Sequence, residues 1–276
     1  MPELPEVETI RRALARGERG GPPLPGQTIL AARVLWPRSV AAPHVAAFAS
    51  RIAGQEIRTL ARRGKYLQIH LSRDVLLVHL RMSGDLYLTP AASEAHRHHR
   101  VLLALSSGYS LAFEDSRKFG RMWLLDDPAP VLDKLGPEPL EAAFTPAWLW
   151  TALQARRRQL KPLLLDQTFL AGLGNIYTDE ALHRARLHPL HIANTITPAE
   201  TAALHAAIVH VLQEGIRHNG ATIDWVYRGG GFQNTFQVYA RAGQPCYTCG
   251  TPVVRLVIGQ RGTHFCPLCQ PAPPAG

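Results

Sequence analysis

The stretch Cys246–Cys269, CYTCGTPVVRLVIGQRGTHFCPLC, decides how the C-terminal part of the chain folds. It contains two Cys-x-x-Cys pairs, Cys246/Cys249 and Cys266/Cys269, with sixteen residues between them. Each pair forms a tight turn that directs two sulfurs to one point, and two pairs close a tetrahedral structural zinc site. The strand-like segment VVRLVI, a turn at Gly259 and a second short strand predict a β-hairpin between the pairs. We therefore expect a four-cysteine zinc finger that holds one structural zinc and is stabilised largely by it.

The composition of the whole chain excludes several classes of protein. The 276 residues are 46% hydrophobic, enough for a substantial core, so the chain is not intrinsically disordered. No apolar run approaches 18 residues, and the first residues, MPELPEVETIRR, carry acids where a signal peptide would have an apolar segment. We expect one large or two modest domains in a cytoplasmic protein without membrane contact.

Charge gives the first indication of a partner. Lys and Arg number 30 against 21 Asp and Glu, a net charge of +9 that attracts polyanions such as nucleic acids. Only Lys65, Lys118, Lys134 and Lys161 are lysines, and the other 26 basic residues are arginines. Arginine binds phosphate in bidentate fashion and stacks on bases. A G+C-rich genome would also favour arginine, so it accounts for the choice of Arg over Lys but not for the net charge.

Hydrophobic periodicity divides the chain into an α+β, multidomain order. Val7, Ile10 and Leu14 share one face of an N-terminal helix, and short strands follow as an antiparallel β-sandwich; the predicted strands are 29–36, 65–71, 75–80, 85–88, 100–105, 110–114 and 121–125. Thr197, Pro198 and Glu200 form a helix-start signal before a long helix over 198–218 that ends at Asn219-Gly220. We expect a catalytic β-sandwich domain at 1–130, a Pro-rich linker at 131–146, a helical domain at 147–240, the zinc finger at 241–270 and a disordered tail at 271–276.

Pro2 is a candidate nucleophile. Removal of Met1 would expose a secondary α-amine with a pKa of about 8, whereas the pKa of a lysine side chain is roughly 10.4. Near neutral pH, a larger fraction of the α-amine is therefore the uncharged nucleophile. Such an amine attacks an aldehyde-like sugar C1′ to give a cationic iminium, which acidifies the neighbouring carbon for elimination. Glu3 could supply a proton to the sugar ring oxygen or to a leaving group. Taken alone, Pro and acids at this position are equally the ordinary chemistry of a helix start.

Six segments together resemble the formamidopyrimidine-DNA glycosylase/endonuclease VIII family: MPELPEVETIRR, RRGKY, HLRMSG, EDSRKFG, LAGLGNIYTDEAL and CYTCG…RGTHFCPLCQ. They span residues 1–270 in the family's order. The resemblance, closest to the formamidopyrimidine branch, implies a helix-two-turn-helix domain at 147–240. It also implies a bifunctional repair enzyme that removes oxidised purines from double-stranded DNA and cleaves the abasic strand by β,δ-elimination. Such an enzyme would act as a monomer on lesions or abasic sites, in the bacterial cytoplasm at the nucleoid.

The resemblance also assigns residues. Pro2 matches the Schiff-base nucleophile, Glu3 the general acid, Lys65 the lysine of β-elimination and Arg261 the finger arginine of δ-elimination. Met82, Arg117 and Phe119 match the residues that fill the gap left by an extruded nucleotide, where an apolar wedge and an arginine facing the orphaned cytosine are physically reasonable. His98, Arg156, Lys161 and Asn175 match, or lie beside, further DNA-contact positions. For each of these residues, an ordinary place in a core or on a solvated face is the alternative.

Three departures from the family bear on specificity. The acid of the family's Lys-His-Asp-His pattern is absent from Arg97-His98-His99-Arg100, and residues 17–27 form an insertion without an assigned role. The loop expected to close over the flipped base, 222–237, is several residues shorter and carries Gly229-Gly230-Gly231 at its tip. Ring-opened purines are therefore the expected substrates, and the preference for 8-oxoguanine and for the opposite base stays open. Alternatives are an endonuclease VIII-like activity on oxidised pyrimidines or abasic sites, a non-catalytic DNA-damage binder and a protein-binding zinc ribbon.

Overall fold

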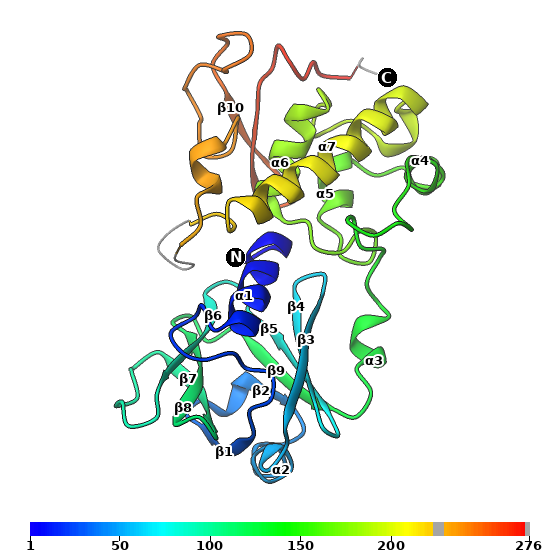
Figure 1. Ribbon diagram of the computed structural model, residues 1–276. Coiled ribbons are helices and arrows are strands. Elements are labelled where there is room, and N and C mark those ends of the chain that lie inside the picture. The colour runs from blue at the N-terminus through cyan, green and yellow to red at the C-terminus, as the bar shows by residue number, and fades with distance from the viewer. Residues whose placement is uncertain (223–228, 274–276) are drawn as a thin grey trace. The chain divides into compact units, whose positions relative to one another are not determined.

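The computed structural model describes residues 1–222 and 229–273 of a chain that forms two compact units (Figure 1). The first unit comprises Met1–Lys134 and Gly220–Gly230, and the second comprises Leu135–Asn219 and Gly231–Gly276. Among the described residues, no helix has the length and apolar character needed to cross a bilayer.

Two sheets build the first unit. One has the order β1 (Ile29–Val34), β7 (His99–Leu105), β8 (Tyr109–Asp115) and β6 (Gly84–Pro90), all antiparallel. The other has the order β2 (Val40–Ala42), β9 (Arg121–Leu125), β5 (Val75–His79), β4 (Tyr66–Leu71) and β3 (Ile57–Arg63), in which only β2 pairs in parallel. Buried apolar side chains from both sheets form one core, which is the expected β-sandwich.

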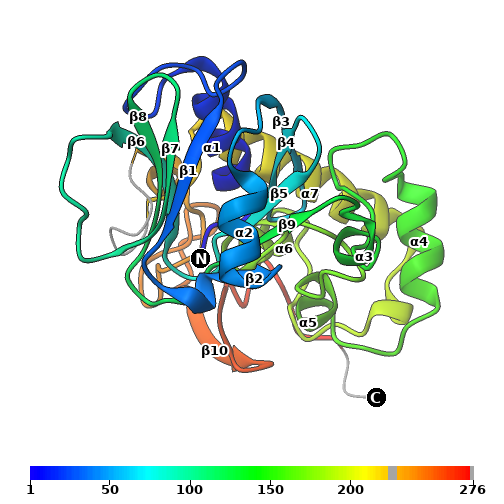
Figure 2. The same cartoon turned by 90° about the horizontal axis from the view of Figure 1, so that it is seen from below.

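Helix α1 (Leu4–Arg16) closes this core. Val7, Ile10 and Leu14 are fully buried, which confirms the predicted apolar face, and the helix packs against β3 and β4. It ends at Gly17, whose φ of 79° provides the left-handed cap that residues with a Cβ rarely adopt. A short helix, α2 (Val45–Ile52), packs against β1 and β2 (Figure 2).

Residues 17–27, which carried no assigned role, continue from α1 and cover the edge strand β6. The Leu88 amide donates to the Arg19 carbonyl at 2.8 Å, and the Arg19 guanidinium forms an ion pair with Asp85. An added Cβ on Gly21 would come 2.9 Å from Leu88 and from Tyr109, so the loop can lie this close only with glycine there. The insertion therefore occupies hydrogen-bonding groups of an edge that would otherwise be open.

The second unit is helical. Its helices are α4 (Pro146–Gln154), α5 (Leu160–Leu164), α6 (Asn175–Arg184) and α7 (Pro198–Arg217), with short 3-10 turns η2 (Ala193–Thr195) and η3 (Phe232–Thr235). The capping box of Thr197 and Glu200 at the start of α7 is present as predicted, and Leu204, Ile208 and Leu212 are fully buried. Strands β10 (Val254–Ile258) and β11 (Arg261–Phe265) form the predicted hairpin of the finger.

The segment 131–146, expected as a linker, is divided between the units. Helix α3 (Ala129–Leu132) belongs to the first unit, whereas the residues after Lys134 pack into the second. There the Gly136 amide donates to the Gln167 carbonyl at 2.9 Å, and the buried Phe144 ring stacks on His205 at 4.6 Å. Prolines in this segment therefore shape a packed connection. In the C-terminal tail, 271–273 have no regular structure, and 274–276 lie outside the described residues.

Candidate active site

Strand register gathers the candidate residues of the first unit at one end of the sandwich. In the five-stranded sheet, Tyr66 pairs with His79 and His79 pairs with Arg121, so these three residues form one row. Directly beyond that row come Lys65 before β4, the loop with Met82 after β5, and Phe119 before β9.

The four-stranded sheet brings its loops to the same end. Gly84 at the start of β6 pairs with Asp115 at the end of β8, and His99 at the start of β7 pairs with Glu114. The loop with Met82 runs from one sheet to the other, as does the turn with Arg117 and Phe119. His98, half-buried, precedes β7 at this end, beside a network in which the Tyr87 hydroxyl bonds His99 Nε2 and Glu114 at 2.8 Å each.

The start of α1 is a buried polar site. Pro2 is buried, and Glu3, the helix N-cap, is 2% exposed. The Glu6 carboxylate accepts the backbone amide of Glu3 at 2.7 Å and that of Ala221 at 2.8 Å. Glu6 therefore fixes the backbone that carries Pro2 and Glu3 against the segment at Gly220–Ala221. An added Cβ on Gly220 would come 2.8 Å from the Glu6 side chain, so this close approach requires glycine.

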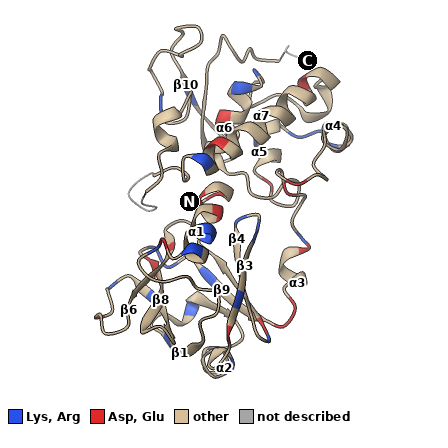
Figure 3. Cartoon of the chain, in the orientation of Figure 1, with Lys and Arg blue, Asp and Glu red and all other residues tan. Residues whose placement is uncertain are grey.

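Glu8 connects α1 to the turn that carries Lys65. Its carboxylate bonds Arg11 and Arg12 at 2.7 Å each and Arg62 at 3.4 Å, and Arg62 in turn donates to the Gly64 carbonyl at 2.9 Å. Burial raises the pKa of Glu8, but the hydrogen bonds from Arg11 and Arg12 outweigh it and bring that pKa to about 2. The carboxylate is therefore ionised throughout the neutral range, and acidic and basic residues lie together on α1 (Figure 3).

Lys65 lies in a buried part of the first unit. Lys65 is 4% exposed, and the neighbouring His79 is also buried. Burial first, and then the charges of Arg81 and Lys65, lower the pKa of His79 to about 3, so the ring is neutral at physiological pH. His79 Nδ1 accepts the Arg81 amide at 3.0 Å and so holds the backbone just before Met82.

The three predicted gap-filling residues differ in how exposed their side chains are. Phe119 is 49% exposed, Arg117 is exposed and Met82 is half-buried. The Arg117 guanidinium lies 5.2 Å from the centre of the Phe119 ring, a cation–π contact that preorganises the pair. An exposed aromatic ring next to a stacked arginine has the form of a wedge for stacked bases.

In the second unit, Lys161 differs from its expected placement on a DNA-contact surface. Its side chain is 0% exposed, and its ammonium bonds Asp179 at 2.6 Å and the Gly262 carbonyl at 3.1 Å. Asp179 also accepts the His264 amide at 2.9 Å. Lys161 therefore cannot reach a phosphate as placed here; burial and the ion pair make it an anchor that holds β11 to helices α5 and α6.

Of the other candidate residues in this unit, Asn175 helps to hold β11 in place, whereas Arg261 and Arg156 are exposed to solvent. Asn175, half-buried at the start of α6, donates to the same Gly262 carbonyl at 2.9 Å, so its amide group also holds β11. Arg261, next to Gly262, is exposed. Arg156 is exposed and its guanidinium lies 5.3 Å from the centre of the Phe169 ring.

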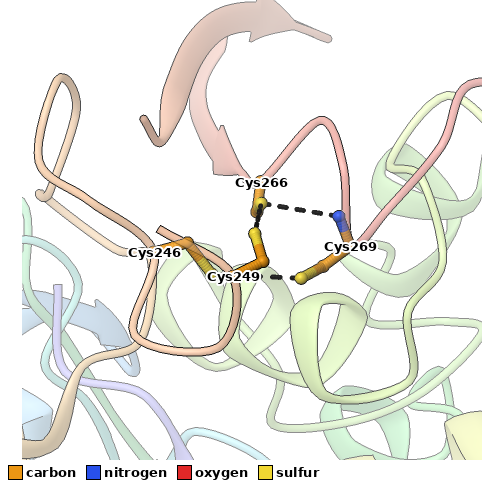
Figure 4. Close-up of side chains that lie close together, drawn as sticks. All are labelled: Cys246, Cys249, Cys266 and Cys269. Carbon is orange, nitrogen blue, oxygen red and sulfur yellow. Dashed lines mark hydrogen bonds between the residues drawn. The ribbon is translucent and has the colours of Figure 1, made fainter. Parts of the chain in front are cut away.

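The cysteine sulfurs meet at one point, as predicted (Figure 4). All four Sγ atoms lie within 4.8 Å of one another, with 3.4 Å between Cys249 and Cys266 and 4.0 Å between Cys246 and Cys269. A tetrahedral site with Zn–S bonds of about 2.3 Å requires sulfurs about 3.8 Å apart, so the four residues fit zinc. His183 of α6 places Nε2 3.6 Å from the Cys246 sulfur. Such a contact from outside the ligand set orients a metal ligand.

The predicted capping loop is only partly within the described chain, since 223–228 lie outside it. The described ends are joined: the Thr222 hydroxyl donates to the Gly230 carbonyl at 3.0 Å and accepts the Gly230 amide at 2.9 Å. The base of the loop is thus closed, and Gly229 has a φ of 101°.

Sequence reasoning missed the residues that brace the site. Glu8, Asp115 and Asp179 were not candidates, although Glu8 and Asp115 lie in the segments MPELPEVETIRR and EDSRKFG and Asp179 lies in LAGLGNIYTDEAL. Their neighbours in sequence do not single them out, since Asp115 follows Glu114 and Asp179 precedes Glu180. Only in the fold are these carboxylates buried, where they must be paired or hydrogen-bonded.

Comparison with protein families accounts for most of the chain. Residues 1–122 match the formamidopyrimidine-DNA glycosylase N-terminal domain, and residues 135–226 match the H2TH domain of the same enzyme. Residues 243–272 match the zinc finger found in FPG and IleRS.

Whole-chain relatives agree. A formamidopyrimidine-DNA glycosylase of Pelotomaculum thermopropionicum is 46% identical over 98% of this chain and 99% of its own length, and one of Chloroflexus aurantiacus is 47% identical over 98% of each. Among solved structures, Lactococcus lactis Fpg (MutM) in complex with FAPY-dG containing DNA is 34% identical with a TM-score of 0.90, covering 98% of this chain and 100% of that one. MutM in complex with carbocyclic 8-oxo-G containing DNA is 36% identical with the same TM-score and coverage.

Proposed function

Because the chain belongs to the formamidopyrimidine-DNA glycosylase family, we propose that the end of its β-sandwich is the catalytic centre of a base-excision DNA glycosylase that also cleaves the abasic strand. One observation carries this proposal. Strand register and the Glu8–Arg62 contact bring the start of α1, the turn with Lys65 and both loops with the gap-filling residues to the same end of the first unit.

Pro2 would act as the nucleophile once Met1 is removed. The nitrogen lone pair bonds to C1′ of the damaged nucleotide while the bond to the base breaks, and the departing base takes up a proton. The C1′–O4′ bond then opens, the amine proton is lost and a cationic C1′=N⁺ bond forms. Loss of a C2′ proton allows the C3′–O bond to break, which cleaves the strand.

Glu3 and Lys65 would supply the charges that these steps need. Glu3, the residue after Pro2 and 2% exposed, would donate a proton to O4′. Lys65, a cation in the turn before β4, would bind the phosphate beside the lesion and assist β-elimination. Arg261, exposed next to the anchored Gly262, would assist δ-elimination. The zinc, when bound, supplies structural stability to the hairpin and no reacting group.

DNA binding follows from the exposed groups of both units. Phe119 and Met82 would fill the space left by the extruded nucleotide, and Arg117 would donate to the O2 and N3 acceptors of the orphaned cytosine. His98, Arg156 and the backbone amides at the start of α6, beside Asn175, would bind phosphates. The protein would act as a monomer on double-stranded DNA of the nucleoid.

The substrates we propose are oxidised purines, with ring-opened formamidopyrimidines first. The two DNA complexes named above contain lesions of this class, which favours it over the endonuclease VIII-like alternative of oxidised pyrimidines. The domain division we propose keeps the sandwich as the catalytic part and the helical part with the finger as a DNA-holding part.

Borohydride trapping tests the mechanism. With intact mass confirming that Met1 is absent, the protein should form a reducible crosslink with abasic DNA, and peptide mapping should place the bond at Pro2. Glu3→Gln should slow base removal more than nicking of preformed abasic sites. A crosslink that maps to another residue, or no crosslink at full zinc occupancy, would refute the assignment.

An incision panel tests the substrate class. Duplexes with formamidopyrimidine, 8-oxoguanine, thymine glycol or an abasic site, each opposite cytosine or its normal partner, separate the two candidates. Faster cleavage of formamidopyrimidine than of thymine glycol supports the proposal, and the reverse order supports the pyrimidine alternative.

A further inference from the structure

A buried carboxylate lies between the two loops that carry the gap-filling residues, and the mechanism above does not use it. Asp115, the last residue of β8, is 0% exposed. Its Oδ1 accepts the Ser83 hydroxyl and the Arg117 amide, the latter at 3.2 Å, and its Oδ2 accepts the Gly120 amide at 2.7 Å. One side chain therefore bonds the loop between β5 and β6 and the turn between β8 and β9.

Each gap-filling residue is adjacent to, or is itself, one of these bonded groups. Met82 precedes Ser83, Arg117 provides its own amide and Phe119 precedes Gly120. The Arg117 amide also donates to the Ser83 hydroxyl at 3.1 Å, so the two loops are bonded to each other as well as to the carboxylate. Displacing either loop would therefore break the hydrogen bonds that join it to the other loop and to Asp115.

The turn is also held by packing and by bonds to its ends. An added Cβ on Gly120 would come 2.3 Å from the Phe113 ring and 3.2 Å from the Asp115 carboxylate, so only glycine allows this approach. The Arg100 guanidinium donates to the Asp115 carbonyl at 2.7 Å, which fixes the end of β8. Lys118, at a φ of 62°, lies 4.1 Å from the Trp36 ring, which holds the apex of the turn.

We propose that Asp115 is a positioning residue that joins the Met82 loop and the Arg117–Phe119 turn into one rigid reader of the opposite strand. The inference rests on the proposed role of those three residues in filling the gap and contacting the orphaned base. Because the arginine and the wedge are held together, correct contact with the opposite base and correct filling of the gap occur together. Asp115 would then determine opposite-base specificity without touching DNA.

The test is Asp115→Asn, which keeps the shape of the side chain but replaces one acceptor oxygen with a donor NH2 group. Either the Gly120 amide or the pair formed by Ser83 and Arg117 then faces a donor. Loss of one hydrogen bond to a charged group changes an equilibrium about tenfold, which corresponds to about 1.4 kcal/mol. We expect the preference for cytosine over adenine opposite the lesion, measured as a ratio of kcat/KM, to fall about tenfold.

Asp74→Asn is the matched control. Asp74 is also buried, accepts hydrogen bonds from Arg51 and Gln55, and lies just before β5, at the opposite end of the strand from His79 and Met82. Both variants lose one buried carboxylate from the same unit, but only Asp115→Asn should change the opposite-base ratio. Borohydride trapping on abasic DNA should stay within about twofold of wild type for both, since RT ln 2 is only about 0.4 kcal/mol.

Ser83→Ala and Arg117→Ala complete the design. Ser83→Ala, which removes only one loop from the network, should lower the ratio in the same direction as Asp115→Asn even if the latter is poorly folded. If Arg117→Ala changes the ratio while Asp115→Asn and Ser83→Ala do not, the positioning role is wrong and the proposed function stands. A ratio that also survives Arg117→Ala overturns both roles, and a wild type that fails to trap abasic DNA overturns the proposed function itself.

Discussion

The first prediction concerns Lys161, which is buried and would act by stabilising the second unit rather than by touching DNA. The ion pair between its ammonium and Asp179 is 2.6 Å long and both side chains are 0% exposed. In Lys161→Met the Asp179 carboxylate still accepts the His264 amide at 2.9 Å but loses the positive charge that balances it. The Gly262 carbonyl loses its bond from Lys161 and keeps the bond from the Asn175 side chain. The hairpin that carries Arg261 loses one of its anchors.

The expected cost follows from the geometry. Removing one partner of a buried ion pair costs about 3–5 kcal/mol, because the other charge is left buried without compensation. The remaining bonds to His264 place Lys161→Met at the lower end, about 3 kcal/mol. With a urea m-value of about 2 kcal/mol/M, the unfolding midpoint of the second unit should fall by about 1.5 M. Arg157→Met, at an exposed basic residue of the same unit, should change the free energy of unfolding by less than about 0.5 kcal/mol.

A double-mutant cycle separates the ion pair from simple loss of packing. Asp179→Asn added to Lys161→Met removes the uncompensated charge yet keeps an acceptor for the His264 amide, so the double variant should recover about 2 kcal/mol. Urea unfolding at fixed zinc concentration measures all four proteins, and the ratio of δ- to β-elimination products reports the position of Arg261. A double variant no more stable than Lys161→Met, or a loss below about 1 kcal/mol for that single change, would refute the reasoning.

Three further predictions rest on separate contacts. Because the pKa of Glu8 is lowered from 4.5 to about 2, the Glu8 carboxylate contributes fully to stability above pH 4.5 and loses that contribution as the pH falls toward 2. The difference in unfolding free energy between wild type and Glu8→Gln should therefore shrink over that interval. A constant difference would contradict the pairing of Glu8 with the arginines. His183→Ala removes the contact to the Cys246 sulfur and should speed zinc transfer to a chromophoric chelator about tenfold, whereas unchanged release would exclude a role at the metal site. Arg117→Ala should weaken opposite-base discrimination more than abasic-site cleavage, and equal losses on every substrate would argue against the assigned contact.

The parts of the fold that sequence predicted are those fixed by local pattern. Val7, Ile10 and Leu14 repeat at helical spacing, and the cysteine spacing defines the hairpin between the pairs, so both were correct before any tertiary contact was considered. Strand β3, IRTLARR, was missed because only Ile57 and Leu60 are buried and a register irregularity between Ile57 and Thr59 interrupts the alternation. Residues 57–63 form a strand because they pair with β4, and the sequence of these residues alone does not reveal that partner.

The candidate site divides in the same way. Motif resemblance could propose groups to meet the substrate, such as Pro2 and Phe119, because the chemistry of each is visible in the residue itself. It misplaced Lys161 because a basic residue in a DNA-binding protein is read as a phosphate contact, while its partner Asp179 lies 18 residues away and becomes adjacent only in the fold. Residues that act by holding others carry no such chemical signature.

The same distinction changes the meaning of the net charge of +9. Arg62 is bound to Glu8, Arg51 to Asp74 and Arg158 to Asp166, so part of the arginine content is paired with acids within the fold. A buried or paired guanidinium adds little to the attraction of a phosphate, because the field of its partner cancels its own at a distance. We therefore expect DNA to be selected by the placement of a few exposed cations, with Arg117 and Arg261 as the proposed ones. Asp115 and Asp179 lower the net charge, yet Asp115 accepts the Arg117 amide and Asp179 accepts the His264 amide of β11. We expect these bonds to increase the precision with which Arg117 and Arg261 meet the strand.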